Sequence, residues 1–331
     1  ELGIPVTIIP QEKRWDLSVL SKVKKFINNC GCDLVHCHGA RANYISLFIR
    51  GGVKVPMITT LHSDYKLDFK DNPRKQLIYT PINAFALRRY KHILAVTKAF
   101  KYMLMLRGFK EERIDVIYNG IDFSQELQTY DMYTFFKNIN VPHDLNKKYV
   151  GIAARLFAVK GVNVFLDMAK IIADKREDID FIILGNGEMW KQCQDFIKGN
   201  KLENRVYMAG QVTDPVMMNS YYKYIDVNTL TSYSESFPYA LLEGARCKCA
   251  TVATAVGGIP EMIIDGESGC LVQSGDSKAL AECVEMLCDK DDIRIRYGVN
   301  FYERAKENFS SQAMANTHKK IYEKIIKENV K

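Results

Sequence analysis

The stretch DVNTLTSYSESFPYALLEGARCKCATVATA, residues 226–255, decides the fold. It begins with a strand-like run rich in β-branched residues at 226–231 and ends with another, more apolar one at 250–255. Between them, Pro238 follows a polar loop and suits the first turn of a helix, where its missing N–H would be unpaired anyway. A strand, a helix and a strand in this order, with strands that are apolar nearly throughout, predict a parallel sheet covered by helices on both faces.

The same alternation runs along the rest of the chain. Segments with apolar residues three and four positions apart, such as Val164, Met168 and Ile171, separate the expected strands and predict helices. The expected strands form two series, 6–9, 33–38, 57–62, 92–97 and 114–119, and then 149–154, 180–185, 205–210, 226–231 and 250–255. Two series predict two doubly wound α/β domains in tandem.

The polar segment NVPHDLNKK, 140–148, is the best boundary between these domains. We therefore expect a Rossmann-like first domain over 1–145 and a second over 146–310. The remaining residues, 311–331, should form a helix that crosses back to the first domain, because an apolar stripe at helical spacing needs a surface to pack on. The members of this stripe are Met314, His318, Ile321, Tyr322 and Ile325.

The composition is that of an ordinary globular protein, with 331 residues, 47% of them hydrophobic and 26% charged. No apolar run approaches the roughly 20 residues needed to cross a bilayer, and no signal peptide is recognisable. The nine cysteines are odd in number and include C-x-C rather than C-x-x-C spacings. They are typical of reduced thiols rather than a disulfide framework or a zinc site, so we expect a cytoplasmic protein.

The charge is uneven along the chain. Residues 1–150 contain 23 Lys and Arg against 14 Asp and Glu, whereas residues 151–331 contain 23 against 25. Basic stretches such as 21–26 and 86–92 favour contact with anionic lipid or an anionic acceptor, although each could also be a solvated helix face. Nucleic-acid binding is disfavoured, since no basic strand interleaved with aromatic residues and no recognition helix stands out.

Ligands of open parallel sheets bind at the carboxyl ends of the strands, so the loops that follow the strands are the place to look for chemistry. Arg155 and Lys160 lie in the loop after 149–154, and Gly161 opens the next helix. Two cations beside a helix N-terminus suit a pyrophosphate, although solvated loop cations remain the alternative.

The next strand ends in Gly185-Asn186-Gly187. A dinucleotide-binding fingerprint would need a third glycine where Trp190 stands and an acidic residue after the strand at 205–210. Both are missing, so a nicotinamide-dependent oxidoreductase is disfavoured. The glycines still permit close approach of a ligand to the backbone.

Glu235 and Glu243 are eight positions apart. In a continuous helix they would be separated by roughly 12 Å along the axis, too far to share a proton. Glu235 should instead precede the helix and Glu243 lie about one and a half turns inside it. Carboxylates accept hydrogen bonds from vicinal hydroxyls and a helix N-terminus attracts phosphate, so this spacing suits a nucleotide-sugar.

These residues, together with motifs at other strand ends, resemble the family 4 retaining glycosyltransferases (glycosyl transferases group 1), which have the GT-B fold of two Rossmann-like domains facing a cleft. The resemblance covers nearly the whole chain. Its motifs are DLVHCHG, ITTLHSDY, ILAVTKAF and VIYNGID in the first half, and ARLFAVKG, ILGNGE, ESFPYALLEGAR and ATAVGGIPE in the second.

The resemblance implies roles for individual residues. Arg155 and Lys160 would neutralise the donor diphosphate and stabilise the leaving phosphate, without a metal. Glu243 would hold the ribose hydroxyls and Glu235 the donor sugar ring. His62 is similar to a histidine close to the reacting sugar.

Other donor contacts are also implied by the resemblance. They involve backbone groups around Ser236, Phe237 and Pro238, the loop Gly185, Asn186 and Gly187, and a base-reading loop at Gln211 and Val212. Pro238 stands where many relatives have glycine. Asp178 and Asp180 form a D-x-D pattern that precedes its strand, so we interpret it as solvated rather than metal-binding. The chain opens with Glu1, and the relatives' first strand and Gly-rich loop are not in the sequence, so we expect the natural polypeptide to start upstream.

The expected function is therefore transfer of a sugar, with retention, from a nucleoside diphosphate donor to an acceptor hydroxyl in cell-surface polysaccharide or glycolipid synthesis. The nucleotide-sugar would be a co-substrate, and no cofactor or metal is expected. The acceptor remains unknown; a lipid-linked glycan at the inner face of the cell membrane fits the basic first half. A sugar-nucleotide epimerase, a phosphorolytic enzyme or a non-catalytic nucleotide-sugar-binding module of the same fold are the alternatives.

Overall fold

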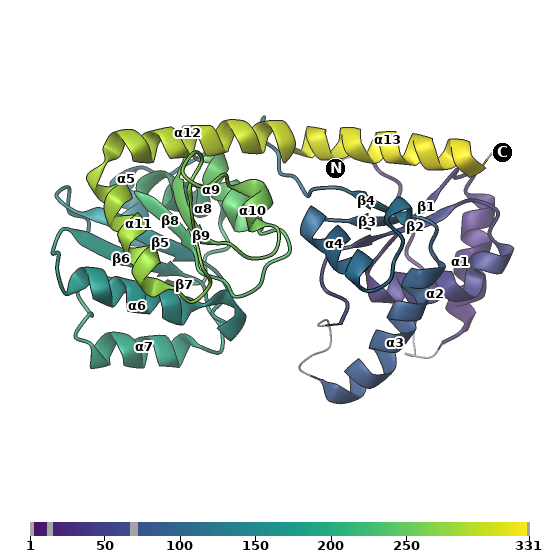
Figure 1. Ribbon diagram of the computed structural model, residues 1–331, viewed down its shortest axis with the longest axis horizontal. Helices are drawn as coiled ribbons and strands as arrows, with labels where there is room; N and C mark the ends of the chain where they lie inside the picture. The colour runs from purple at the N-terminus through teal and green to yellow at the C-terminus, as the bar shows by residue number, and fades with distance from the viewer. Residues whose placement is uncertain (1–2, 12–15, 67–71, 330–331) are drawn as a thin grey trace. The chain divides into compact units, whose positions relative to one another are not determined.

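Two parallel sheets organise the residues that the computed structural model describes, which are 3–11, 16–66 and 72–329 (Figure 1). The chain divides into two units. The first unit comprises Glu1–Ile117 and Ala315–Lys331, and the second unit comprises Tyr118–Met314. Both have helices packed on a parallel sheet, which confirms the expected α/β class with two domains.

The sheet of the first unit has the strand order β1-β2-β3-β4, with every pairing parallel. The strands are β1 (Val35–His38), β2 (Met57–Leu61), β3 (Ile93–Ala95) and β4 (Ile114–Val116). Because the strand order follows the chain order, consecutive strands bring their carboxyl ends side by side. His38 ends β1 and His62 directly follows β2, so these two histidines meet at one edge of the sheet.

Two helices of the first unit begin at capping side chains. Asn72 accepts a hydrogen bond from the Lys75 backbone N–H at the start of α3, and Thr97 does the same for Phe100 in α4. The helices are α1 (Ser18–Asn29), α2 (Gly39–Ile49), α3 (Pro73–Arg89), α4 (Lys98–Leu106) and, from Ala315 onward, α13 (Ser311–Asn329), with short 3₁₀ turns at Arg50–Gly52 and Glu111–Arg113.

The second unit has a six-stranded parallel sheet in the order β10-β9-β8-β5-β6-β7. The chain builds outward from β5 in one direction, returns, and then builds outward from β8 in the other. The switch between β5 and β8 is where an open parallel sheet leaves a crevice for ligands. The strands are β5 (Lys148–Ala153), β6 (Ile179–Leu184), β7 (Val206–Gly210), β8 (Val227–Leu230), β9 (Ala250–Thr254) and β10 (Cys270–Val272).

The strands of this sheet are buried on both faces. Phe181 and Ile183 of β6 pack into one core cluster with α6, α7 and α11, whereas Ile182 and Leu184 pack into another with α5 and α8. Alternate side chains point to opposite faces of a strand, so a central strand must be apolar at every position. The helices are α5 (Met132–Asn138), α6 (Val162–Ala173), α7 (Trp190–Gly199), α8 (Pro215–Tyr224), α9 (Tyr239–Arg246), α10 (Ile259–Met262), α11 (Ser277–Asp289) and α12 (Asp291–Asn308), with a 3₁₀ turn at Ala158–Lys160.

Nine of the ten expected strands are present. The tenth, at 6–9, is wrong: no strand forms there, and Val6 and Ile8 are 80% and 84% exposed. A β-branched run becomes a strand only where a neighbouring strand and a packed face receive it, and among the described residues none pairs with this segment. The sequence also missed β10, whose three residues are too few to show a period.

The units divide the chain at other places than the sequence-based domain boundaries. Residues 118–145 group with the second unit rather than the first, because Phe135 and Phe136 of α5 are buried in the cluster that includes α8. The interpretation of both acids of the D-x-D pattern as solvated is wrong for Asp180. Its side chain is buried and forms ion pairs with Arg205 at 2.8 Å and Lys147 at 3.3 Å.

Candidate functional site

The carboxyl edge of the second unit's sheet brings together the loops that follow β5, β6 and β8. A Cβ atom at Gly161 would overlap the carbonyl oxygen of Thr231, and one at Gly185 would overlap the carbonyl oxygen of Ala154. Both glycines also have positive φ, at 62° and 136°. Only glycine fits these two positions, so the loops approach one another more closely than side chains would allow.

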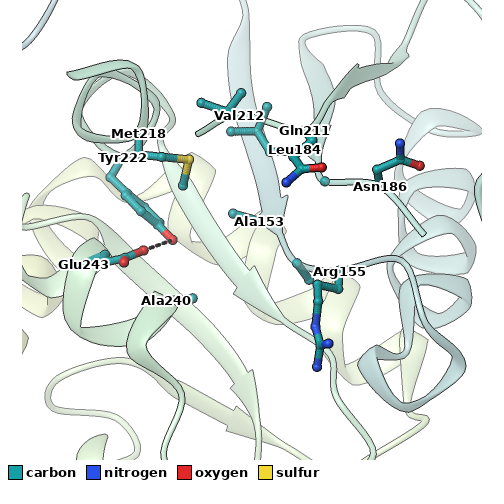
Figure 2. Close-up of a pocket in the computed structure, with 12 residues that line it drawn as sticks. Ala153, Arg155, Leu184, Asn186, Gln211, Val212, Met218, Tyr222, Ala240 and Glu243 are labelled. Carbon is teal, nitrogen blue, oxygen red and sulfur yellow. Dashed lines mark hydrogen bonds between the residues drawn. The ribbon is translucent and has the colours of Figure 1, made fainter. Parts of the chain in front are cut away.

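A cavity of about 310 Å³ opens at this edge (Figure 2). Arg155 follows β5 and lines one part of it, whereas Glu243 reaches it from α9. Six of the residues expected to contact the donor line this one cavity: Arg155, Gly185, Asn186, Gln211, Val212 and Glu243. The structure thus assembles residues that are up to 88 positions apart in the sequence.

Glu243 is the half-buried carboxylate of this cavity. Burial raises its pKa above the ordinary value for a glutamate, while the charge of Arg246 and a hydrogen bond from Tyr222 act in the opposite direction. The Tyr222 hydroxyl lies 3.5 Å from Glu243 Oε2 (Figure 2). Tyr222 is fully buried, which raises its pKa well above the ordinary value and keeps it a hydrogen-bond donor. A carboxylate with one fixed donor retains acceptor capacity for the hydroxyls of a ligand.

Lys160 and Glu235 form a second group, in the loops that follow β5 and β8. Lys160 Nζ lies 2.6 Å from Glu235 Oε1, and the Ser232 hydroxyl donates to the same oxygen at 2.6 Å. The Glu235 side chain is 8% exposed and that of Lys160 is 20% exposed. An ion pair with so little solvent access fixes both side chains in position. Neither residue lines the cavity itself.

The glycine turn after β9 packs against the backbone of Glu235. Gly257 has φ of 55°, and a Cβ there would overlap the carbonyl oxygen of Glu235. The turn therefore packs directly on the backbone of the loop that carries this carboxylate.

The remaining residues expected around the donor sugar have different surroundings. Phe237 is 4% exposed, and its ring packs against Tyr118 and Phe309. Its side chain therefore belongs to the core, and only its backbone remains for a ligand. Pro238 is the N-cap of α9 with φ of −75°, directly before the first helical residue, and Ser236 is half-buried in the preceding loop. Gly187 packs its Cα on the backbone of Leu156, since a Cβ there would lie 2.5 Å from that carbonyl oxygen.

His62 belongs to a histidine cluster in the first unit. His38 Nδ1 and His62 Nε2 are 2.9 Å apart, and the rings of His36 and His38 have centroids 4.2 Å apart. His36 also bonds to the Tyr322 hydroxyl of α13 at 2.5 Å and to Thr60 at 2.7 Å. Burial, followed by the charges of neighbouring histidines, lowers the pKa of His36 to about 3 and also lowers the pKa values of His38 and His62. These rings are therefore neutral at pH 7.

The sequence-based reasoning missed some walls of the cavity. Met218 and Tyr222 of α8 and Ala240 of α9 line it as well. Met218 and Tyr222 are four positions apart and therefore share one face of their helix, which was the available signal. That signal does not say whether the face meets a core or a ligand. Within the described residues, no group of three or more His, Cys, Asp or Glu is arranged to hold a metal ion.

Comparison with known proteins extends over the whole chain. The model of the family described as Glycosyl transferases group 1 matches residues 135–308, more than half of the sequence. A second family model, Glycosyltransferase Family 4, matches residues 1–125. Together they contain all the motifs quoted above and leave out residues 126–134 and 309–331.

Individual relatives agree with the family matches. An uncharacterized glycosyltransferase of Methanocaldococcus jannaschii is 27% identical over 305 residues, which cover 91% of this chain and 78% of the relative. The N,N'-diacetylbacillosaminyl-diphospho-undecaprenol alpha-1,3-N-acetylgalactosaminyltransferase of Campylobacter jejuni is 24% identical, over 99% of this chain and 88% of its own length. The crystal structure of Anabaena HepE in complex with UDP superimposes with a TM-score of 0.77 at 22% identity, over 93% of this chain and 82% of that one.

Proposed function

This chain belongs to the glycosyl transferases group 1 and has the GT-B fold, and from that premise we propose that it transfers a sugar from a nucleoside diphosphate donor to an acceptor hydroxyl. The observation that carries this proposal is the cavity at the carboxyl edge of the second sheet. Arg155 supplies a cation and Glu243 a half-buried carboxylate in its lining, and the Lys160–Glu235 pair lies in the loops that follow β5 and β8.

The nucleoside would occupy the cavity. Glu243 accepts hydrogen bonds from the two ribose hydroxyls, because vicinal hydroxyls match the two oxygens of a carboxylate. The base then lies against Gln211 and Val212, and the glycine loop at Gly185 lets the nucleotide approach the backbone. The UDP bound to Anabaena HepE supports a nucleoside diphosphate as the ligand class.

The diphosphate would be held by Arg155 and Lys160. Two cations at the point where negative charge develops stabilise the transition state more than the ground state, and we propose that they do so without a metal ion. Lys160 is bound to Glu235 at 2.6 Å, so the arriving diphosphate shares Lys160 with that carboxylate. Glu235 in turn accepts hydrogen bonds from the donor sugar and orients it.

We propose retention by attack on the same face. The bond between the anomeric carbon and the phosphate oxygen breaks, the acceptor oxygen bonds to that carbon, and the acceptor proton passes to the departing phosphate oxygen. We give Glu235 the role of an orienting group: Lys160 and Ser232 both contact its Oε1 and fix the carboxylate, and the donor sugar would bond to Oε2.

The acceptor is proposed to be a lipid-linked glycan in cell-surface polysaccharide or glycolipid synthesis, reached from the cytoplasmic face of the membrane. Two observations support it. The first unit contains 25 Lys and Arg against 12 Asp and Glu, which favours an anionic partner. The Campylobacter relative is named for a diphospho-undecaprenol acceptor. Among the described residues, no helix has the length and apolarity to cross a membrane.

The experiment is a panel of nucleotide-sugars scored by thermal shift, followed by nucleotide release with and without candidate acceptors. A donor that binds the native state raises its melting temperature by mass action. Release of nucleoside diphosphate only when acceptor is present supports transfer. Stabilisation without release would identify a nucleotide-sugar-binding module, and acceptor-independent conversion of the donor would identify an epimerase or a phosphorolytic enzyme.

A further inference from the structure

Helix α3 (Pro73–Arg89) of the first unit has two opposite faces. Asn83, Ala86 and Leu87 are spaced at three and four residues and are buried. The Asn83 side chain bonds to Asn43 of α2 at 3.0 Å, so this face is the one that packs on the unit. None of the residues in the first two turns of the helix, from Pro73 to Ile78, is buried. Figure 1 shows these turns projecting away from the four-stranded sheet.

The outer face of α3 is apolar at its centre. Ile78, Pro81 and Phe85 follow one another at spacings of three and four, which places them in one stripe on the side opposite Asn83. Ile78 is 51% exposed and Phe85 50% exposed, and Leu77 beside them is 79% exposed. Single exposed apolar residues are common on protein surfaces, but a stripe of them along a helix marks a surface that contacts something apolar.

Cations flank this stripe at both ends. Arg74 lies four residues before Ile78, and Arg89 lies four residues after Phe85, so both share the outer face. The Arg89 guanidinium stacks over the Phe85 ring at 5.1 Å from its centroid. The sequence of α3, PRKQLIYTPINAFALRR, contains no acidic residue. Long arginine side chains can cover apolar surface while keeping their charge in the headgroup layer.

We propose that this outer face, made by Arg74, Leu77, Ile78, Pro81, Phe85 and Arg89, docks the protein onto an anionic lipid surface. An apolar stripe with basic ends is the pattern of a helix that lies in the membrane interface. A second copy of the chain fits less well, because a symmetric contact would place the arginines of the two copies together. The inference deepens the proposed contact with a membrane and rests on it for its biological role.

The test is co-sedimentation of the full chain with vesicles of phosphatidylcholine alone and of phosphatidylcholine mixed with phosphatidylglycerol, without donor or acceptor. The wild type should bind the mixed vesicles and lose binding as salt increases. The variant Arg74→Glu/Arg89→Glu should reduce the partition coefficient at least about tenfold, since each basic residue near an anionic surface contributes on the order of 1 kcal/mol. Ile78→Glu/Phe85→Glu should also reduce the partition coefficient, because the new carboxylates repel the anionic lipid and the two apolar side chains are no longer available for insertion.

The matched control is Lys319→Glu/Lys320→Glu on α13, which makes the same change in net charge at exposed positions of the first unit. It should keep most of the binding. Equal loss in the control, equal binding to phosphatidylcholine alone, or no binding to either vesicle would overturn the proposal. A dimer of the wild type by light scattering that Ile78→Glu/Phe85→Glu dissociates would assign the face to a second copy instead. Donor-induced thermal shifts of the same variants report separately on the proposed reaction.

Discussion

The two units share one architecture and differ in charge. The first unit carries 25 Lys and Arg against 12 Asp and Glu, whereas the second carries 21 against 27. The proposed site for an anionic donor nevertheless lies in the acidic unit. Under this proposal a few cations at the strand ends, rather than the net charge of the unit, decide where a small anion binds. The diffuse positive charge of the first unit suits an extended anionic surface instead.

The two units also differ in the residues at the carboxyl ends of their strands. In the second unit they present Gly185, Arg155 and Glu243 in the lining of a cavity and, outside that lining, the ion pair of Lys160 with Glu235. In the first unit the ends of β1 and β2 present a cluster of neutral histidines. Predictions that separate the two units therefore test whether donor binding belongs to the second unit alone.

The largest effect is expected at the cations and carboxylates of the second unit. Lys160→Ala removes a positive charge that would stabilise the negative charge developing on the leaving phosphate. We therefore expect kcat for acceptor-dependent nucleotide release to fall by about 10²- to 10³-fold. Glu243→Ala should weaken donor binding and abolish the donor-induced thermal shift. The measurements are initial rates and melting temperatures with a donor identified by the thermal-shift panel.

The matched control for this prediction is Lys170→Ala on α6. Lys170 forms an exposed ion pair with Asp174 at 2.7 Å, four residues away, so its removal takes the same charge from the same unit far from the strand ends. Rates should stay within about twofold of the wild type, since surface pairs contribute little. Equal losses for Lys170→Ala and Lys160→Ala would show that net charge, not position, is responsible.

An intermediate effect is expected from the glycine turn behind Glu235. Gly257→Ala places a Cβ where the carbonyl oxygen of Glu235 lies and adds a side chain at a φ of 55°. We expect the free energy of unfolding of the second unit to fall by about 2 kcal/mol and the donor affinity to fall with it. Gly199→Ala, where a Cβ meets no atom within 4 Å, is the control and should be close to neutral. Urea unfolding of the two variants measures this difference. An unchanged free energy of unfolding for Gly257→Ala would contradict the close packing.

The sequence predicted the second unit better than the first. The positions of Arg155 at a strand end and Glu243 inside the next helix were enough to expect both at the carboxyl edge of the sheet, because the rule that ligands bind there is topological. The ion pair of Glu235 with Lys160 was not expected. Met218 and Tyr222 were not predicted to line the cavity, because a helix face that lines a cavity has the same periodicity as one that packs in a core.

The failures have a common cause. The run at 6–9 is rich in β-branched residues but has no partner strand among the described residues. Asp180 is an aspartate, a residue type that is usually solvated, but it is buried beside Arg205. In both cases the structure depends on residues that are distant in the sequence, and the local propensity of a segment carries no information about them. Gly185 was expected to let a ligand approach the backbone; in the structure the close contact at this position is with the backbone of Ala154.

The smallest effect is expected from the histidine cluster, and it should appear only in the first unit. The pKa of His36 is lowered to about 3 by burial and by the facing histidines His38, His318 and His62. In the unfolded chain the pKa of a histidine is about 6.5. Above that pH neither state binds the proton and the cluster has its full stability. Between pH 6.5 and about 3 the unfolded state binds a proton that folded His36 does not, so stability falls as the pH falls.

Hydrogen exchange separates the two units in this respect. Between pH 7 and pH 5, after correction for intrinsic exchange, opening of β1 and β2 should become easier by about 1 kcal/mol, reduced from the full linkage value by partial solvent exposure. Opening of β5 and β8 should lack this component because the second unit has no such cluster among its described residues. His36→Asn should flatten the pH dependence of β1 and β2 even if it lowers their stability at pH 7. If both units, or the variant and the wild type, show the same slope, the histidines do not set the acid sensitivity of the first unit.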